Sequence, residues 1–442
     1  MDNLVIVVSM FPVLFFLIFI GFPVSFCFIG LSLFYSVGFF GPSIGIQLVG
    51  RVYDVATNYS YAAIPLFIFM GTLLEHSGIA ERLFEAINLW TGRIPGGLAV
   101  STIIMSAIIA AASGIIGAVE VLVGLLAIPA MIKYSYDKSL ISGTICAGGA
   151  LGTIIPPSLV AVVYAPIANV SMGALLIGII IPGLLLACIY IIYILIRCKL
   201  RPEDGPRLSK EVMSQYSFNE KMRITLKSLI PPFILIFAVM GSIIMGLAPP
   251  TEAAALGAFG TLILCIGYRK LDLKLMIRAL LYTIRTTSMI MFIIVGGIMF
   301  SGVFLVNGGQ TLIENAIKSL NISPHAMILL FIFLTFLSGF VLDCFSMILV
   351  LVPIFAPLVA KAGMDTLWFA VLFMIVIQTS YLTPPMAPSI FYLKGIAPPS
   401  ITTRHMFRGI IPYIILQCII IVVVWIVPSI ATWLPSQLLG FK

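Results

Sequence analysis

Two proline pairs inside apolar stretches are the strongest chemical signal in this sequence, Pro156-Pro157 and Pro384-Pro385. Proline lacks an amide donor and disfavours the α region at the residue before it, so a helix must unwind at each pair. Unwinding at membrane depth frees carbonyl oxygens, around 152–155 and 381–383, which suit a hard cation such as Na⁺. The helix that resumes after each pair directs its partially positive N-terminus at an anion. A repaired kink would explain one pair alone, whereas two pairs at matching positions favour a binding site.

Two Ser-Gly tips, at Ser113 and at Ser338-Gly339, offer further oxygen atoms. Their glycines allow another backbone segment to approach closely. Hydroxyl groups near the second proline pair come from Thr379, Ser380 and Thr383. Because Ser and Thr in membrane helices usually bond back to their own helix, each of these residues could be a ligand or simply structural.

Two carboxylates, Glu120 and Asp343, also stand within apolar stretches. An ionisable residue at membrane depth is costly, so each is a functional-site hypothesis by default. Glu120 follows Ser113 by seven residues, so a continuous helix would place both side chains on about the same face. The alternative for either carboxylate is a structural role, paired with a basic group or protonated inside the helix bundle.

The composition shows what surrounds these residues. Of the 442 residues, 61% are hydrophobic and 9% are charged, whereas a soluble protein is about half apolar and about a quarter charged. The lipid bilayer must therefore be the main solvent. The net charge of +8 does not indicate nucleic-acid binding, because the basic residues cluster in a few short loops, as membrane topology requires.

Enzymatic and metal chemistry find no support in the sequence. The seven cysteines are scattered without a CxxC pair, and the three histidines, His76, His325 and His405, are far apart. A serine protease would need a Ser–His pair at membrane depth. An ATP-driven pump would need a P-loop, GxxxxGK[ST], which is absent. We therefore expect no enzyme, and no cofactor or metal other than a coupling ion.

Ten apolar runs predict membrane-spanning helices, because each approaches the ~20 residues that cross a bilayer. The first run lacks the basic start and the cleavage site of a signal peptide, so we interpret it as a retained span. The predicted spans are 4–21, 24–40, 61–77, 139–170, 173–196, 229–247, 252–267, 286–306, 366–395 and 409–431.

Two further apolar blocks, 97–132 and 325–360, do not fit as single spans, because small or polar residues lie at their centres. Each half has only ~16 residues, about 24 Å of helix, which is short of a full crossing. We therefore predict two re-entrant helical hairpins whose polar tips lie inside the protein. Each hairpin precedes a proline-broken span, at 139–170 and at 366–395.

The two halves of the chain repeat, because 1–196 and 229–442 each show three spans, a hairpin, a broken span and a last span. The basic segment between them, 197–228, predicts a cytoplasmic linker, and the halves then have opposite orientations with both chain ends outside. Such inverted repeats are typical of secondary transporters. The more polar segments 75–93 and 309–320 could be interfacial helices that join a fixed scaffold to a moving unit, or simple surface helices.

These motifs resemble the large membrane subunit (DctM-type) of tripartite ATP-independent periplasmic (TRAP) transporters over essentially the whole chain. The matching residues are Ile64-Pro65-Leu66-Phe67, Ala112-Ser113-Gly114, Gly152-Thr153-Ile154-Ile155-Pro156-Pro157-Ser158, Leu342-Asp343, Pro353 and Thr383-Pro384-Pro385. The resemblance implies an elevator-type transporter of the bacterial inner membrane that uses Na⁺ to import an organic acid. It also implies two partners, a small membrane subunit (DctQ-type) and a periplasmic binding protein that delivers the substrate.

The resemblance also implies the ligands of two Na⁺ sites. The first would use Ser113, Gly152, Ile155 and Pro157, and the second would use the Ser338-Gly339 tip with the segment from Thr383 to Met386. We expect Asp343 to add charge to the second site. The residues expected to bind the substrate carboxylate or to tune the sites are Glu120, Ser158, Thr379 and Ser380.

A second interpretation is a stand-alone ion-coupled organic-anion carrier or antiporter of the same architecture, which needs no soluble partner. The sequence separates the two interpretations poorly. Co-purification of a small membrane subunit, or a neighbouring gene for a secreted binding protein, would decide between them.

Overall fold

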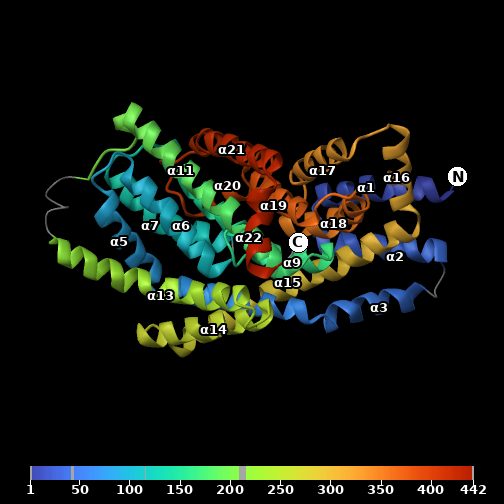
Figure 1. Ribbon diagram of the computed structural model, residues 1–442, viewed down its shortest axis with the longest axis horizontal. Helices are drawn as coiled ribbons and strands as arrows, with labels where there is room; N and C mark the ends of the chain where they lie inside the picture. The colour runs from blue at the N-terminus through green and yellow to red at the C-terminus, as the bar shows by residue number, and fades with distance from the viewer. Residues whose placement is uncertain (1, 41–43, 115, 209–215, 441–442) are drawn as a thin grey trace.

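The computed structural model describes residues 2–40, 44–114, 116–208 and 216–440 (Figure 1). Every regular element in these ranges is a helix, which confirms the predicted all-α fold. One stretch of the predicted linker, 209–215, lies outside the described residues.

The helices follow one another along the chain in two halves. The first half contains α1 (Asp2–Ile20), α2 (Val24–Phe40), α3 (Ile44–Thr57), η1 (Tyr59–Ala62), α4 (Ala63–His76), α5 (Ile79–Thr91), α6 (Gly97–Ser113), α7 (Ile116–Lys133), α8 (Lys138–Ala150), η2 (Leu151–Thr153), α9 (Leu159–Ala168), α10 (Met172–Gly178) and α11 (Ile180–Leu200). The second half contains α13 (Phe218–Ile244), α14 (Pro250–Gly267), α15 (Leu273–Val306), α16 (Gly309–Ser319), α17 (Pro324–Ser338), α18 (Cys344–Lys361), α19 (Thr366–Leu382), α20 (Pro388–Ile396), α21 (Thr403–Ile426) and α22 (Ser429–Leu439).

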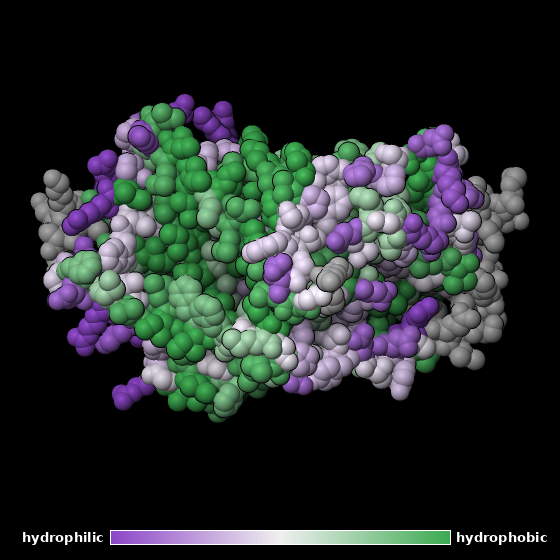
Figure 2. Space-filling view, viewed as in Figure 1, coloured by the Kyte–Doolittle hydropathy of each residue, from purple (hydrophilic) through white to green (hydrophobic). Residues whose placement is uncertain are grey.

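The described helices are those of a polytopic membrane protein. Seven of them are long and apolar enough to cross a bilayer, or up to eight if the bent pair Tyr59–His76 and Ile79–Thr91 counts as one span. Shorter apolar helices, such as the halves of the broken spans, fall outside that count, and a helix lies at each of the ten predicted positions. Figure 2 shows a broad apolar surface with hydrophilic groups gathered toward the two ends of the long axis.

α15 is longer than the sequence suggested, because the span expected at 286–306 is only the end of a helix that begins at Leu273. Asp272 caps this helix by accepting a hydrogen bond from the amide of Leu275. Neither Gly nor Pro interrupts the helix before Gly296, so nothing in the sequence stops it. α15 packs against α2, α4 and α18, which places it beside the second hairpin.

The polar segments before the two hairpins are amphipathic helices, α5 and α16. Each follows a glycine in the left-handed conformation, Gly78 at φ 75° and Gly308 at φ 83°, which residues with a side chain adopt only at a cost. The turn at Gly78 bends α5 by 62° from the helix before it. The role of these helices as links between a scaffold and a moving unit stays a prediction.

The predicted hairpins are the pairs α6–α7 and α17–α18, which lie in opposite halves of the molecule in Figure 1. α7 and α18 each have 18 residues and are long and apolar enough to cross a bilayer alone. The second arm of each hairpin is therefore longer than the sequence suggested, and the re-entrant path stays a prediction.

The two halves share one core, because the broken span of the first packs on the last span of the second. A Cβ added to Gly143 of α8 would lie 2.1 Å from the carbonyl oxygen of Gly409 in α21. Small residues allow membrane helices to approach this closely. A hydrogen bond of 2.8 Å between the hydroxyls of Thr144 and Tyr413 crosses the same interface.

Candidate ion and substrate site

Both helices break at the proline pairs, as predicted. α8 and η2 end before Pro156, and α9 resumes at Leu159, whereas α19 ends at Leu382 and α20 resumes at Pro388. The Pro156-Pro157 and Pro384-Pro385 peptide bonds are both cis. Each break therefore interrupts a buried helix and starts a new one, which is the arrangement that exposes carbonyl oxygens inside a membrane protein.

The first tip rests directly on the first break. Gly114 has a left-handed φ of 66°, and a Cβ added there would lie 2.7 Å from the carbonyl oxygen of Pro157. The neighbouring Ser113 is buried, and its Oγ has no hydrogen-bond partner among the described residues. A buried hydroxyl without a partner is costly unless a ligand or water fills its place.

Three carbonyl oxygens of the first break have no hydrogen-bond donor among the described residues, and that of Pro157 lies beside this tip. The carbonyls of Gly152, Ile155 and Pro157 accept no hydrogen bond from the described part of the chain. Ser158, by contrast, is the N-cap of α9, and its hydroxyl donates to the carbonyl of Thr153 at 2.5 Å. The structure thus places the tip beside the carbonyl of Pro157 and gives Ser158 a structural bond, and the predicted set of four ligands stays a prediction.

The second tip packs on the second break in a similar way. A Cβ added to Gly339 would lie 2.3 Å from the Cβ and Oγ of Ser380. The hydroxyls here bond back to their own helices, Ser338 to Leu334 at 2.8 Å and Thr383 to Thr379 at 2.7 Å. The same holds for Thr379 and Ser380, which donate to the carbonyls of Ile375 and Ile377. The lone pairs of these oxygens remain available to a cation, whereas the side chain of Met386 is 44% exposed.

Asp343 begins α18 rather than standing within a helix. Its carboxylate accepts a hydrogen bond from the amide of Phe345 at 3.1 Å and a second, short one from the hydroxyl of Ser346. An N-cap aspartate is a common way to start a helix. The carboxylate is nevertheless exposed to a central cavity, so it combines a structural bond with a charge at the site.

Glu120 is fully buried in α7, away from the face that the sequence suggested. α6 ends at Ser113 and α7 begins at Ile116, so no continuous helix relates Glu120 to Ser113. Its Oε2 accepts a long hydrogen bond of 3.5 Å from the hydroxyl of Tyr381, and its Cβ packs against Gly149 of α8. Glu120 therefore connects the first hairpin to both broken spans and does not line the cavity.

A cavity of about 630 Å³ lies between the two tips and the two breaks. Gly114, Gly339, Asp343 and Ser380 line it, but Ser158 and Thr379 do not. Polar residues that the sequence did not predict at the site also line it, among them Glu75, Tyr282 and Tyr392, together with Tyr381 of the predicted second break. Tyr381 lies within the second broken segment, so its position was a usable signal, whereas Glu75 and Tyr282 reach the cavity only through the packing of α4 and α15.

The fold and this site define an all-helical membrane transporter, with a cavity where two broken helices meet the tips of two helix pairs. The chain matches the model of the family "Tripartite ATP-independent periplasmic transporter, DctM component" over residues 11–430, and it belongs to that family. This confirms the resemblance, places the chain in the bacterial inner membrane as a multi-pass protein, and identifies a transporter rather than an enzyme.

Relatives of known name cover most of the chain. It is 29% identical to the C4-dicarboxylate TRAP transporter large permease protein DctM of Pseudomonas aeruginosa, over 93% of this chain and 94% of that protein. It is also 29% identical to the isethionate TRAP transporter permease protein DctMQ of Oleidesulfovibrio alaskensis, over 88% of this chain and 60% of that protein. Among solved structures, the Alcanivorax borkumensis YdaH transporter has the same fold, with a TM-score of 0.61 and 13% identity over 89% of each chain.

Proposed function

We propose that this chain is the translocating subunit of a Na⁺-coupled importer of a small organic anion, and that it works by an elevator movement. The observation that carries the proposal is the charge of the cavity wall. The wall holds the carboxylates of Glu75 and Asp343, and no Lys, Arg or His among its described residues. An anion entering this cavity is repelled unless cations enter with it, so bound cations supply attraction as well as driving force.

Helix ends give the cavity a second source of positive potential. The first residues of four helices line it, Ile116 of α7, Leu159 of α9, Cys344 of α18 and Pro388 of α20. Each helix N-terminus carries partial positive charge, which favours a carboxylate, although Ser158 and Asp343 already accept one amide each at the starts of α9 and α18. The volume of about 630 Å³ suits a small ligand, and the two relatives are named for small organic anions, C4-dicarboxylate and isethionate.

Two cation sites follow from the tips and the breaks. The first has the hydroxyl of Ser113 and the carbonyls of Gly152, Ile155 and Pro157, and the second has the Gly339 tip and the segment after Thr383. Both sites are mainly neutral oxygen, which suits Na⁺ better than a proton relay. Asp343 adds one negative charge at the second site.

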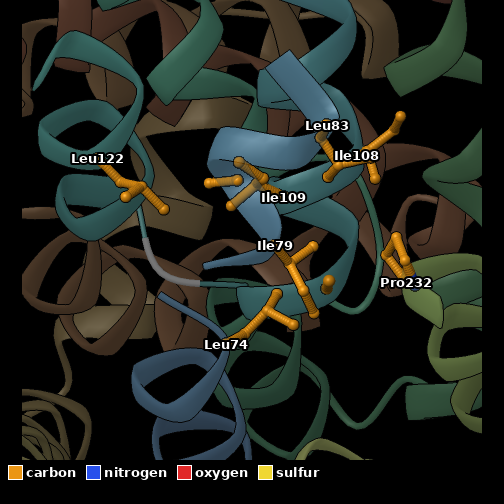
Figure 3. A pocket seen from close by; sticks show the side chains of 9 residues that line it. Leu74, Ile79, Leu83, Ile108, Ile109, Leu122 and Pro232 are labelled. Carbon is orange, nitrogen blue, oxygen red and sulfur yellow. The ribbon is translucent and has the colours of Figure 1, made fainter. Parts of the chain in front are cut away.

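An elevator movement requires that the first hairpin slide against its neighbours, and the contact between them suits sliding. Figure 3 shows Leu74, Ile79 and Leu83 of α4–α5 facing Ile108 and Ile109 of α6, with Leu122 of α7 and Pro232 of α13 nearby. All residues that line this contact are apolar, so no hydrogen bond between their side chains has to break when the two bodies move. This part of the contact is thus held by non-directional packing. Farther along, the hydroxyls of Thr91 in α5 and Ser101 in α6 share a hydrogen bond of 2.6 Å, which a sliding movement would have to break.

The partners are proposed from the family and its relatives. The name DctMQ of the Oleidesulfovibrio alaskensis protein combines the large subunit (M) with the small subunit (Q), and this chain aligns with 60% of that protein. The remaining length leaves room for a fused small membrane subunit, which here would be a separate protein of the DctQ type. A periplasmic binding protein would deliver the substrate. Failure of any small membrane subunit to co-purify would favour the stand-alone carrier instead.

Reconstitution into liposomes tests the proposal as a whole. Uptake of labelled organic acids should require an inward sodium gradient, a small membrane subunit and a periplasmic binding protein. A matched potassium gradient is the control and should give only leak. Equal uptake under both gradients would exclude sodium coupling, and uptake without the binding protein would exclude the three-part system.

Ser113→Ala and Asp343→Asn test the two cation sites. Asn caps a helix about as well as Asp, so Asp343→Asn removes the charge and keeps α18 in place. We expect it to raise the sodium concentration for half-maximal uptake roughly 10- to 150-fold, since a hydrogen bond or contact to a charge is worth about 1.5–3 kcal/mol. Ser113→Ala removes one neutral ligand among several, so it should raise the sodium concentration for half-maximal uptake by a smaller factor. An unchanged sodium dependence with lower expression would show that these residues are structural.

A further inference from the structure

A second cavity, of about 500 Å³, opens at the end of α11 where the chain enters the linker. α8, α11 and α21 form its walls, and it is separate from the cavity between the hairpin tips. Three arginines line it, Arg197 and Arg201 of the α11 end and Arg408 of α21, and its described lining contains no carboxylate. This concentration of positive charge beside a membrane helix is not explained by the transport site.

Arg197 is held rigidly at the base of this cavity. Its guanidinium donates to Asp204 at 2.8 Å, to Asp137 at 2.9 Å and to the hydroxyl of Tyr193 at 3.1 Å. Three of the five N–H donors of the guanidinium are thereby used, and two are left for a ligand. Neither Asp137 nor Asp204 lines the cavity, so these two acidic partners orient the guanidinium without closing the cavity.

Arg201 and Arg408 are exposed and make no ion pair among the described residues. Apolar side chains continue the same cavity toward the lipid-facing surface, with exposed fractions of 54% for Ile196, 77% for Leu200 and 54% for Ile411. In Figure 2 the hydrophilic groups near this end of α11 stand directly beside an apolar stretch of surface. Positive charge on one side and exposed apolar surface on the other match a phospholipid, whose headgroup is anionic and whose chains are apolar.

We propose that this cavity binds the headgroup of an anionic phospholipid, with its acyl chains along Ile196, Leu200 and Ile411. The basic linker places it in the cytoplasmic leaflet, where basic pockets between helices are suited to anionic headgroups. The phosphate bridges the end of α11, through Arg197 and Arg201, to Arg408 at the start of α21. The bound lipid thereby ties these two helices together at the membrane surface.

Phosphatidylglycerol binding, measured by native mass spectrometry on the full chain with any subunit that stays bound to it, tests the proposal. In the double variant R201Q/R408Q the affinity should fall roughly 10- to 30-fold, because two surface arginines each contribute to attracting an anionic lipid. The matched control is K199Q/R223Q, which removes two exposed basic residues outside the cavity and should bind as the wild type does. R201K/R408K keeps the charges and should retain most of the binding.

Three results would overturn the proposal. Equal loss of phosphatidylglycerol in both double variants would mean that general surface charge, and not this cavity, attracts the lipid. Unchanged binding in R201Q/R408Q would mean that another group, such as a partner subunit, covers the arginines. Displacement of the lipid by millimolar inorganic phosphate would mean that the cavity binds a free anion. Phosphatidylcholine should bind all variants equally, which also reports whether the variants are folded.

Discussion

Cross-linking Leu74→Cys to Ile109→Cys should reduce uptake to the level of empty liposomes. Leu74 lies in α4, on the proposed scaffold, and Ile109 lies in α6, on the proposed moving unit, and both line the apolar contact in Figure 3. If the hairpin must slide past α4 during each transport cycle, a covalent bond across this contact prevents that movement and therefore prevents transport. Sodium-driven uptake is measured before and after treatment with a short bifunctional thiol reagent. The exposed Cys188 and Cys418 are replaced by Ser so that they do not react.

The matched control keeps Ile109→Cys and moves the second cysteine within the hairpin, to Leu122→Cys. Leu122 lines the same contact but belongs to α7, so this bond joins two helices that move together. Uptake should survive it. Delivery of substrate by the binding protein should survive both bonds. Full activity of the cross-linked Leu74–Ile109 protein would exclude an elevator and favour a rocking or local-gate movement.

Gly114→Ala should lower the affinity for Na⁺ roughly tenfold, the largest effect we expect from one methyl group. Gly114 has a φ of 66°, and its added Cβ would lie 2.7 Å from the carbonyl oxygen of Pro157, so the tip must move away from the break. A contact to a charged group is worth about 1.5–3 kcal/mol, and about 1.4 kcal/mol is a factor of ten in affinity, so displacing one ligand contact lowers the affinity at least tenfold. The sodium dependence of substrate uptake measures the change.

Gly246→Ala is the control that separates the cost of the left-handed backbone from the effect of the contact with Pro157. Gly246 has the same φ of 66°, in the connection between α13 and α14, but nothing lies within 4 Å of its added Cβ. This variant carries the backbone cost without the contact and should keep normal sodium dependence. If Gly246→Ala and Gly114→Ala behave alike, the tip does not form a cation site with Pro157.

The sequence alone determined the class of protein, the positions of the helices and the two breaks. These features depend mainly on local chemistry, because an apolar run must become a helix in lipid and a proline pair favours a break. For the same reason the repeated order of hairpin and broken span was readable in both halves. Local chemistry is not sufficient for a break, since the pair Pro231-Pro232 lies inside the continuous helix α13. The extension of α15 to Leu273 was missed, because the basic residues there suggested a loop, although Asp272 and the absence of Gly and Pro favoured a helix.

Only the tertiary structure decided which oxygens meet. As sequence, Asp343 was the stronger candidate and Ser113 the weaker one, yet the hydroxyl of Ser113 is buried without a described partner while the carboxylate of Asp343 caps α18. Glu75 and Tyr282 line the cavity and Glu120 does not, which the sequence did not predict. The reason is that α4, α7 and α15 pack at angles that no local sequence pattern encodes. The physical reason is the sequence separation of the interactions. Helix unwinding and capping depend on residues that are close in the chain, whereas a cavity is formed by contacts between helices that are far apart in the chain.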